Sequence, residues 1–177
     1  TLDGPISRVK ANGRSGNCGF TLEKSVAELM DYIRAVYAVL PDVKIGVLTN
    51  FPNWAYDTYP AYHGTVINHG DYKVVLEAIL AASVAQDLPI HYVIVDNPWG
   101  YASGTHTSAD PPTTEVDWLQ RILDLETQVK SHGLPFGLIY NSEFGGNMSG
   151  TQFANDVVSY IEAYQAKGGS PDIRSVE

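Results

Sequence analysis

The chain has 177 residues, of which 44% are hydrophobic and 18% are charged, so it can form a core and is not a wholly disordered chain. Lys and Arg number 11 against 20 Asp and Glu, a net charge of -9 that argues against a basic nucleic-acid-binding face. The apolar runs are shorter than the roughly 18 residues that a membrane span needs, and no signal peptide opens the sequence. We expect one soluble domain over 1–177 that binds neither nucleic acid nor a membrane; its compartment is left open, secretion included.

Helix-like and strand-like segments alternate along the sequence. In chain order we predict a helix over 21–42, a strand over 43–50, a helix over 71–87, a strand over 90–97, a helix over 114–132, a strand over 136–141, a helix over 149–167 and a strand over 172–176. Thr21 can cap the first helix, whose buried stripe would extend from Val26 to Leu40. Ser149 and Gln152 have the spacing of a capping box.

Strands that alternate with helices and read as continuous apolar runs are typical of a parallel α/β sheet. The four strand–helix repeats predict part of a (β/α)8 (TIM) barrel, with about four βα units in a single domain. Asp3 would follow a strand that is missing from the sequence. A complete open sheet of four strands is the alternative, and it would leave two apolar edges to protect.

The loops that follow the predicted strands are much longer than the turns that precede them. The segments 51–70 and 98–113 are long, whereas the turn at 88–89 is short. In a parallel sheet all strand-to-helix loops emerge beyond the carboxyl ends of the strands, where α/β proteins build their sites. We therefore expect a functional site on that face.

Polar or acidic residues end each predicted strand. They are Asn50, Asp96 with Asn97, Asn141 with Ser142 and Glu143, and Glu177. Converging carboxylates are what general acid–base chemistry requires, since one can hold a proton while another stays charged. The alternative is that Asp96 and Asn97 are turn or helix-capping residues.

Aromatic residues crowd the same loops, among them Trp54, Tyr56, Trp99 and Tyr101. Flat aromatic faces beside acidic and amide side chains are typical of a carbohydrate cleft, where sugar C–H faces stack and hydroxyls form hydrogen bonds. A self-packed loop core is the alternative for the aromatics at 54–62.

Other chemistries have weaker support. His63, His69 and His106 lie in long loops, but no metal-binding spacing joins them. Ser142 follows a strand without the G-x-S-x-G motif, and Cys18 looks like a loop thiol. No phosphate-binding glycine motif occurs, so we expect neither a cofactor nor a metal.

The segment Ile139-Tyr140-Asn141-Ser142-Glu143, the strand that ends in Glu177 and the Trp/Tyr-bearing loops resemble those of the TIM-barrel glycoside hydrolases. The resemblance lies in the strand endings rather than in the whole chain. In the large retaining class an Asn-Glu pair supplies the acid/base, and a Glu that ends a later strand supplies the nucleophile. Here Ser142 separates Asn141 from Glu143, and Glu177 ends the very next strand.

The hypothesis is a glycoside hydrolase with Glu143 as general acid/base and Asp96 or Glu177 as the partner carboxylate. The residues expected to bind sugar are Asn50, Trp54, Tyr56, Asn97, Trp99, Tyr101 and Asn141. A non-catalytic carbohydrate-binding module is the second hypothesis, and an inactive, self-associating half-barrel fragment is the third. Because open sheet edges need cover, we expect a homodimer or a larger assembly.

Overall fold

A computed structural model describes residues 1–6, 19–57, 69–106, 116–142 and 149–176 of the protein. The strands are β1 (Leu2–Asp3), β2 (Gly46–Asn50), β3 (Tyr92–Asp96), β4 (Phe136–Tyr140) and β5 (Ile173–Val176). The helices are α2 (Leu22–Val39), α3 (Tyr72–Ala85), α4 (Trp99–Ala102), α5 (Trp118–Ser131) and α6 (Gly150–Ala166), with a 3-10 turn η1 (Phe51–Asn53). The predicted alternation of helices and strands is confirmed.

The five strands form one parallel sheet in the order β1-β2-β3-β4-β5. The prediction for Asp3 was wrong, because this residue lies within the first strand and pairs with Leu48 rather than following a missing strand. A strand of two residues is too short to produce a sequence pattern. The α/β class with parallel strands is therefore confirmed, with one strand more than the sequence indicated.

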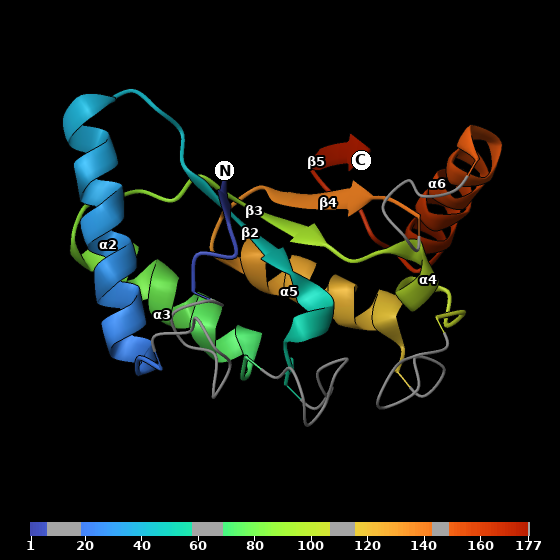
Figure 1. Cartoon of the computed structure of the whole chain (residues 1–177), viewed down its shortest axis with the longest axis horizontal. Coiled ribbons are helices and arrows are strands. Elements are labelled where there is room, and N and C mark those ends of the chain that lie inside the picture. The colour runs from blue at the N-terminus through green and yellow to red at the C-terminus, as the bar shows by residue number, and fades with distance from the viewer. Residues whose placement is uncertain (7–18, 58–68, 107–115, 143–148, 177) are drawn as a thin grey trace.

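The four long helices follow one another around one side of the sheet, from α2 to α6 (Figure 1). This arrangement follows from the strand order, because right-handed crossovers between successive neighbouring strands place every helix on the same face. Val47, Val93 and Leu138 point into this helix-covered side and are fully buried. No described helix covers the opposite face of the sheet, which we call the inner face.

Side chains on the inner face pack against one another across the strands. Gly46 and Tyr92 are register partners, and the ring of Tyr92 lies so close over the glycine that an added Cβ would come within 2.0 Å of it. The Tyr92 hydroxyl reaches Thr1 Oγ1 at 3.0 Å, next to β1. One ring thus spans from β3 to the chain beside β1 and covers β2.

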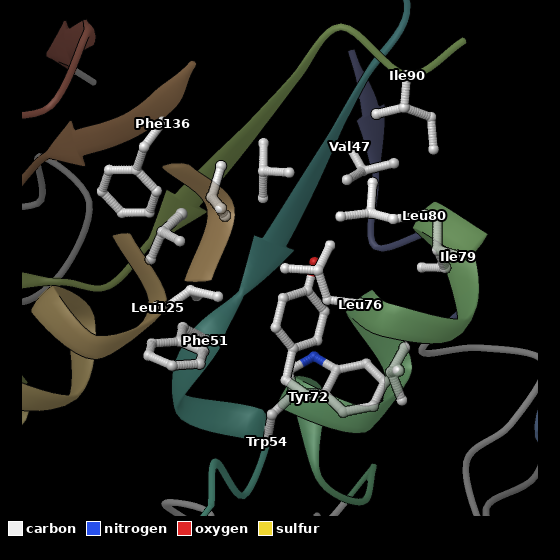
Figure 2. Close-up of a cluster of buried hydrophobic side chains, with 14 of the residues drawn as sticks. Val47, Phe51, Trp54, Tyr72, Leu76, Ile79, Leu80, Ile90, Leu125 and Phe136 are labelled. Atoms are coloured by element: carbon white, nitrogen blue, oxygen red, sulfur yellow. The ribbon is translucent and has the colours of Figure 1, made fainter. Parts of the chain in front are cut away.

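The main core lies between the sheet and the helices. Figure 2 shows Val47 of β2 facing Leu76, Ile79 and Leu80 of α3, with Phe51 and Trp54 packed at the end of the strand. All of these side chains are buried. Burying each such side chain contributes about 1.5–3 kcal/mol, so this layer fixes the helix-covered side of the sheet.

Side-chain caps begin the four long helices. The side chain of Thr21 accepts a hydrogen bond from the amide of Lys24 at 3.3 Å, and that of Asp71 accepts one from the amide of Lys73 at 2.9 Å. The side chain of Asp117 accepts one from the amide of Gln120 at 3.0 Å, and that of Ser149 accepts one from the amide of Gln152 at 3.2 Å. Such a cap contributes about 1 kcal/mol, which explains why the helices begin where they do.

Three details of the helix predictions were wrong. The third long helix begins at Trp118 rather than near residue 114, because Asp117 is the residue that caps it. The capping box is only half formed, since the side chain of Gln152 donates to Asp156 instead of reaching back to Ser149. Leu40 is 56% exposed because α2 has ended at Val39, so it no longer continues the buried stripe.

A buried carboxylate ties α5, α6 and β5 together at the opposite end of the sheet from the long loops. Glu126 is 4% exposed and accepts hydrogen bonds from the Tyr164 hydroxyl at 2.5 Å and from Lys130 Nζ at 2.7 Å. The Ser170 amide also donates to it, at 3.1 Å. This network is fully engaged in holding the elements together, so we assign it to the scaffold.

Within the described residues, no helix is both long enough and apolar enough to span a bilayer.

Candidate functional site

Three predicted site residues lie at the carboxyl ends of adjacent strands. Asn50 and Asp96 are register partners at the ends of β2 and β3. Asp96 is level with Ile139 on β4, and Asn141 follows two positions later on the same face. Side chains two apart on a strand share a face, so Asn50, Asp96 and Asn141 all lie on the inner face. We call these residues, with Asn97 and Ser142, the strand-end cluster.

A direct hydrogen bond joins two members of the strand-end cluster. Asn141 Nδ2 donates to Asp96 Oδ1 over 2.9 Å. Asn141 is only 7% exposed, whereas Asp96 is partly exposed. Because Nδ2 is turned to the carboxylate, Oδ1 of Asn141 points elsewhere, and it has no hydrogen-bond partner among the described residues. The pair therefore leaves a partly exposed carboxylate at this edge of the sheet, with a buried amide oxygen beside it.

Asn97 and Ser142 lie deeper than their neighbours, and both are fully buried. The Asn97 backbone carbonyl accepts a hydrogen bond from the Tyr160 hydroxyl of α6 at 2.8 Å. Burial raises the pKa of Tyr160 well above its usual value, so the hydroxyl remains a donor. The side-chain Oδ1 of Asn97 is buried and has no partner among the described residues. Asn97 is thus both an anchor for α6 and a second unsatisfied acceptor.

The aromatic residues of the described segment after β2, which ends at residue 57, are packed inside the molecule. Trp54 and Tyr56 are each 2% exposed. The ring centroids of Phe51 and Tyr56 lie 5.5 Å apart in an edge-on contact, and those of Trp54 and Tyr72 lie 5.2 Å apart. The Tyr56 hydroxyl donates to Gln128 Oε1 of α5 at 2.9 Å. This packing favours the alternative that the aromatics form the core of the loop, and sugar stacking by Trp54 and Tyr56 stays an untested prediction.

A buried arginine holds the loop after β2. Arg121 of α5 is fully buried and donates from Nη2 to the carbonyl of Phe51 at 2.9 Å and to that of Trp54. Its guanidinium lies 4.2 Å from the centroid of the Phe51 ring and 4.6 Å from that of Trp118. Cation–π contacts of this kind are strongest where water is excluded. Arg121 therefore fixes the first turn beyond Asn50.

Sequence reasoning did not identify Arg121, although a signal was present. Its position lies on the same helical stripe as Trp118, Ile122 and Leu125, which are buried apolar residues. A charged residue on an apolar stripe is nearly always paired when buried, so it indicates a specific partner. The partners here are backbone carbonyls, which no side-chain pattern reveals.

The aromatic residues after β3 are more accessible. Trp99 and Tyr101 lie in α4 and are partly exposed. The Trp99 amide donates to the Asn141 carbonyl at 3.2 Å, and its ring lies 5.4 Å from that of Tyr160. The ring of Tyr101 stacks on that of His106, with the ring centroids 4.5 Å apart. Of the predicted aromatic residues, Trp99 is therefore the one that the backbone ties directly to the strand-end cluster.

Two predicted catalytic residues, Glu143 and Glu177, lie outside the described residues, and their roles stay predictions. The same holds for His63 and Cys18. The ring of His69 packs against that of Trp54, with the ring centroids 5.0 Å apart, while His106 stacks on Tyr101. Within the described ranges no three His, Cys, Asp or Glu side chains are grouped closely enough to hold a metal ion.

Two hollows lined by described residues lie away from the strand-end cluster. One of about 300 Å³ lies beside β1 and α2, and another of about 450 Å³ lies where α3 and α5 end. Neither is lined by Asp96 or Asn141. The candidate site is therefore defined by side-chain chemistry at the strand ends. Comparison of the chain with protein-family models, curated proteins and solved structures found no match.

Proposed function

We propose that the chain is a glycoside hydrolase built on a partial (β/α)8 barrel, with its site at the carboxyl ends of β2, β3 and β4. The observation that carries the proposal is the contact of Asp96 with Asn141, which joins a carboxylate and an amide on neighbouring parallel strands. The strand order and the single helix-covered face are what consecutive units of such a barrel require.

Glycoside hydrolysis uses two carboxyl groups, one that protonates the leaving oxygen and one that attacks the anomeric carbon or activates a water. The amide of Asn141 holds the Asp96 carboxyl group in place at the strand end, which suits Asp96 to the second role. Glu143 is the proposed acid/base. Glu177 is the alternative partner carboxylate, and Asn50, Asn97, Trp99, Tyr101 and Asn141 are the proposed sugar-binding residues.

The test is a panel of glycosides assayed with the purified chain and with Asp96→Asn and Glu143→Gln. Loss of a catalytic carboxyl removes on the order of 10²–10⁴ in rate, so each variant should lose nearly all turnover. Asp31→Asn, on the exposed surface of α2, is the matched control and should keep full activity. If both site variants retain the activity of the unaltered chain, the assignment is wrong.

The sheet edges support a second proposal, a non-catalytic carbohydrate-binding or inactive half-barrel that associates with further copies. Within the described residues, β1 pairs only with β2 and β5 only with β4, and Val176 of β5 is 56% exposed. Unpaired strand edges are templates for association. Sedimentation velocity should then show a dimer or larger species, and calorimetry should show oligosaccharide binding without turnover. A monomer at all concentrations would contradict the association.

A further inference from the structure

The hollow of about 450 Å³ lies where α3 and α5 end, at the amino ends of the strands and away from the strand-end cluster. Its volume is within the range of about 300–1,000 Å³ that small-molecule sites occupy. Its lining is mainly apolar and includes Leu80, Ala81, Val84, Ile90 and Leu134. Leu80 and Ile90, which lie near each other in Figure 2, are each 5% exposed and form its floor.

The local sequence explains why this space is open. Ala81 and Ala85 lie one helical turn apart on α3 and both line the hollow, so this side of the helix end carries small side chains. On the other side, α5 ends at Ser131, and Gly133 turns the chain away toward β4 with a φ of +71°. The short side chains and the early end of α5 together leave the apolar floor accessible.

The polar side chains that line the hollow are a serine and one charged pair. Ser83 Oγ donates to the Leu88 carbonyl at 2.7 Å and accepts from the Ile90 amide at 3.2 Å, so this hydroxyl is already engaged. His132 Nε2 donates to Glu77 Oε1 at 2.9 Å, and the two side chains are 35% and 50% exposed. A ligand in the hollow would therefore meet an apolar wall beside one imidazole–carboxylate pair.

Glu77 is held in place as a charged acceptor. Its Oε1 also accepts from Gln128 Nε2 at 2.6 Å, and the Tyr56 hydroxyl fixes that amide by donating to Gln128 Oε1 at 2.9 Å. The hydrogen bonds from Gln128 and His132 lower the pKa of Glu77, so the carboxylate stays charged at neutral pH. Its second oxygen, Oε2, accepts no hydrogen bond from a described residue. That oxygen is available to a donor from a ligand.

The cations nearest to the ends of the two helices are engaged with other acids. Lys130, in the last turn of α5, contacts Glu126 at 2.7 Å, and Arg34 of α2 pairs with Asp31. No Lys or Arg is found among the described residues that line the hollow. The carboxyl ends of α3 and α5 add the negative ends of two helix dipoles, and the exposed Asp87 adds a charge just beyond α3. The surroundings of the hollow therefore favour a cation.

From the apolar lining and the fixed carboxylate we propose that this hollow binds a small lipophilic cation, an aryl- or alkylammonium ion. Its apolar body would lie on Leu80, Ile90 and Leu134, and its ammonium group would contact Glu77. A neutral ligand of the same shape gains only the apolar contact, and a carboxylate ligand meets the like charge of Glu77. The site is separate from the strand-end cluster and does not depend on the proposed glycoside hydrolase activity.

Three probes of similar shape test the proposal, namely 2-phenylethylammonium, 2-phenylethanol and 3-phenylpropanoate. Each is titrated into the methyl-labelled chain at about pH 8, where imidazole side chains are ordinarily uncharged and do not compete with the ammonium group. The ammonium ion should shift the methyl signals of Ala81, Val84 and Leu134 and bind at least about threefold more tightly than the alcohol at low salt. This preference should shrink in about 0.5 M salt, and the carboxylate should bind most weakly.

Two variants separate the charge from the shape of the hollow. Glu77→Gln can still accept the hydrogen bonds of Gln128 and His132, and it should reduce the affinity for the ammonium ion to that for the alcohol. Ala81→Leu fills the hollow and should abolish binding of both. Glu162→Gln, on the exposed surface of α6, is the matched control and should leave every affinity unchanged.

Equal affinity for the three probes, or a preference for the ammonium ion that persists in Glu77→Gln, overturns the proposal. Absence of any shift in the methyl signals of the hollow overturns it as well. If the probes do not bind and Ala81→Leu changes the sedimentation coefficient, the hollow belongs instead to an interface between copies of the chain. Loss of glycosidase activity in the strand-end variants has no bearing on these outcomes.

Discussion

Asn141 donates a hydrogen bond from Nδ2 to Oδ1 of Asp96 over 2.9 Å, and this bond joins the carboxyl ends of β3 and β4. Side chains at the ends of neighbouring parallel strands meet because the strands share a direction and a register. The pair gives the strand-end cluster a fixed geometry, with the carboxylate held on the inner face and the free amide oxygen turned away from it.

Asn141→Asp should replace this bond with a repulsion between two carboxylates. The new carboxyl would titrate at a pKa raised by its neighbour, so stability should increase as the pH falls through that raised value. Urea unfolding at the two pH values should show a loss of about 2 kcal/mol in unfolding free energy at pH 7 and a smaller loss near pH 4. Asn141→Ser is the control, and its loss should vary less with pH because it introduces no second carboxyl group. The same loss at both pH values for the aspartate variant would contradict the prediction.

Arg121→Lys should loosen the loop after β2 while preserving the charge. Lysine lacks the planar fork that bonds the carbonyls of Phe51 and Trp54 and stacks on two rings, so it cannot replace arginine here. We expect a loss of about 2–4 kcal/mol in unfolding free energy and faster limited proteolysis after residue 50. Arg34→Lys, on the exposed surface of α2, should change neither measurement. Wild-type stability in Arg121→Lys would show that the guanidinium contacts contribute little.

Gly46→Ala should destabilise the sheet because the added methyl group overlaps the ring of Tyr92. We expect a loss of about 1–3 kcal/mol, as is typical of overpacking. The double variant with Tyr92→Leu should lose less than the sum of the two single changes, because removing the ring removes the clash. Thermal unfolding of all four proteins measures the coupling. Simple additivity would mean that the ring moves aside at no cost.

Asp172→Asn should remove a negative charge that stabilises the folded chain at neutral pH but not in acid. The hydrogen bond from the Phe136 amide, at 3.0 Å, and nearby Lys130 lower the pKa of Asp172. A lowered pKa in the folded state gives stability that is present above the unfolded value near 3.8 and is lost as the pH falls through the folded value. Because the carboxyl is largely exposed, the loss at pH 7 should be no more than about 1 kcal/mol.

Unfolding measured over a range of pH tests whether the charge of Asp172 is stabilising. Urea unfolding of Asp172→Asn should approach that of the unaltered protein near pH 2, where both carry an uncharged group. Asp42→Asn, in the exposed turn before β2, is the control that should behave like the unaltered chain throughout. A gap that stays constant from pH 7 to pH 2 would mean that the charge plays no part.

Local chemistry made much of the fold predictable from the sequence. Thr21 and Ser149 were identified as caps because short polar side chains before an apolar stripe satisfy free helix amides, and both make those bonds. The strands that end at Asn50 and Asp96 were recognised as buried apolar runs. The two-residue strand β1 was not, since it is held by pairing with β2 and not by any pattern of its own.

The candidate site was predictable only in part. Strand direction placed Asn50, Asp96 and Asn141 at one edge, since parallel strands end on the same side. The burial of Trp54 was not predictable, because an aromatic loop residue has the same local sequence whether it faces a ligand or the core. Its packing against Tyr72 of α3 involves a residue from a different element.

The sequence by itself determined the order of helices and strands and their parallel direction, because these depend on patterns of residues close in the chain. Only the tertiary structure decided that Asn141 bonds Asp96, that Arg121 holds the loop after β2, and that Tyr92 lies over Gly46. Such contacts depend on strand register and on helix packing, which are set by the collective burial of the core and not by the residues that meet.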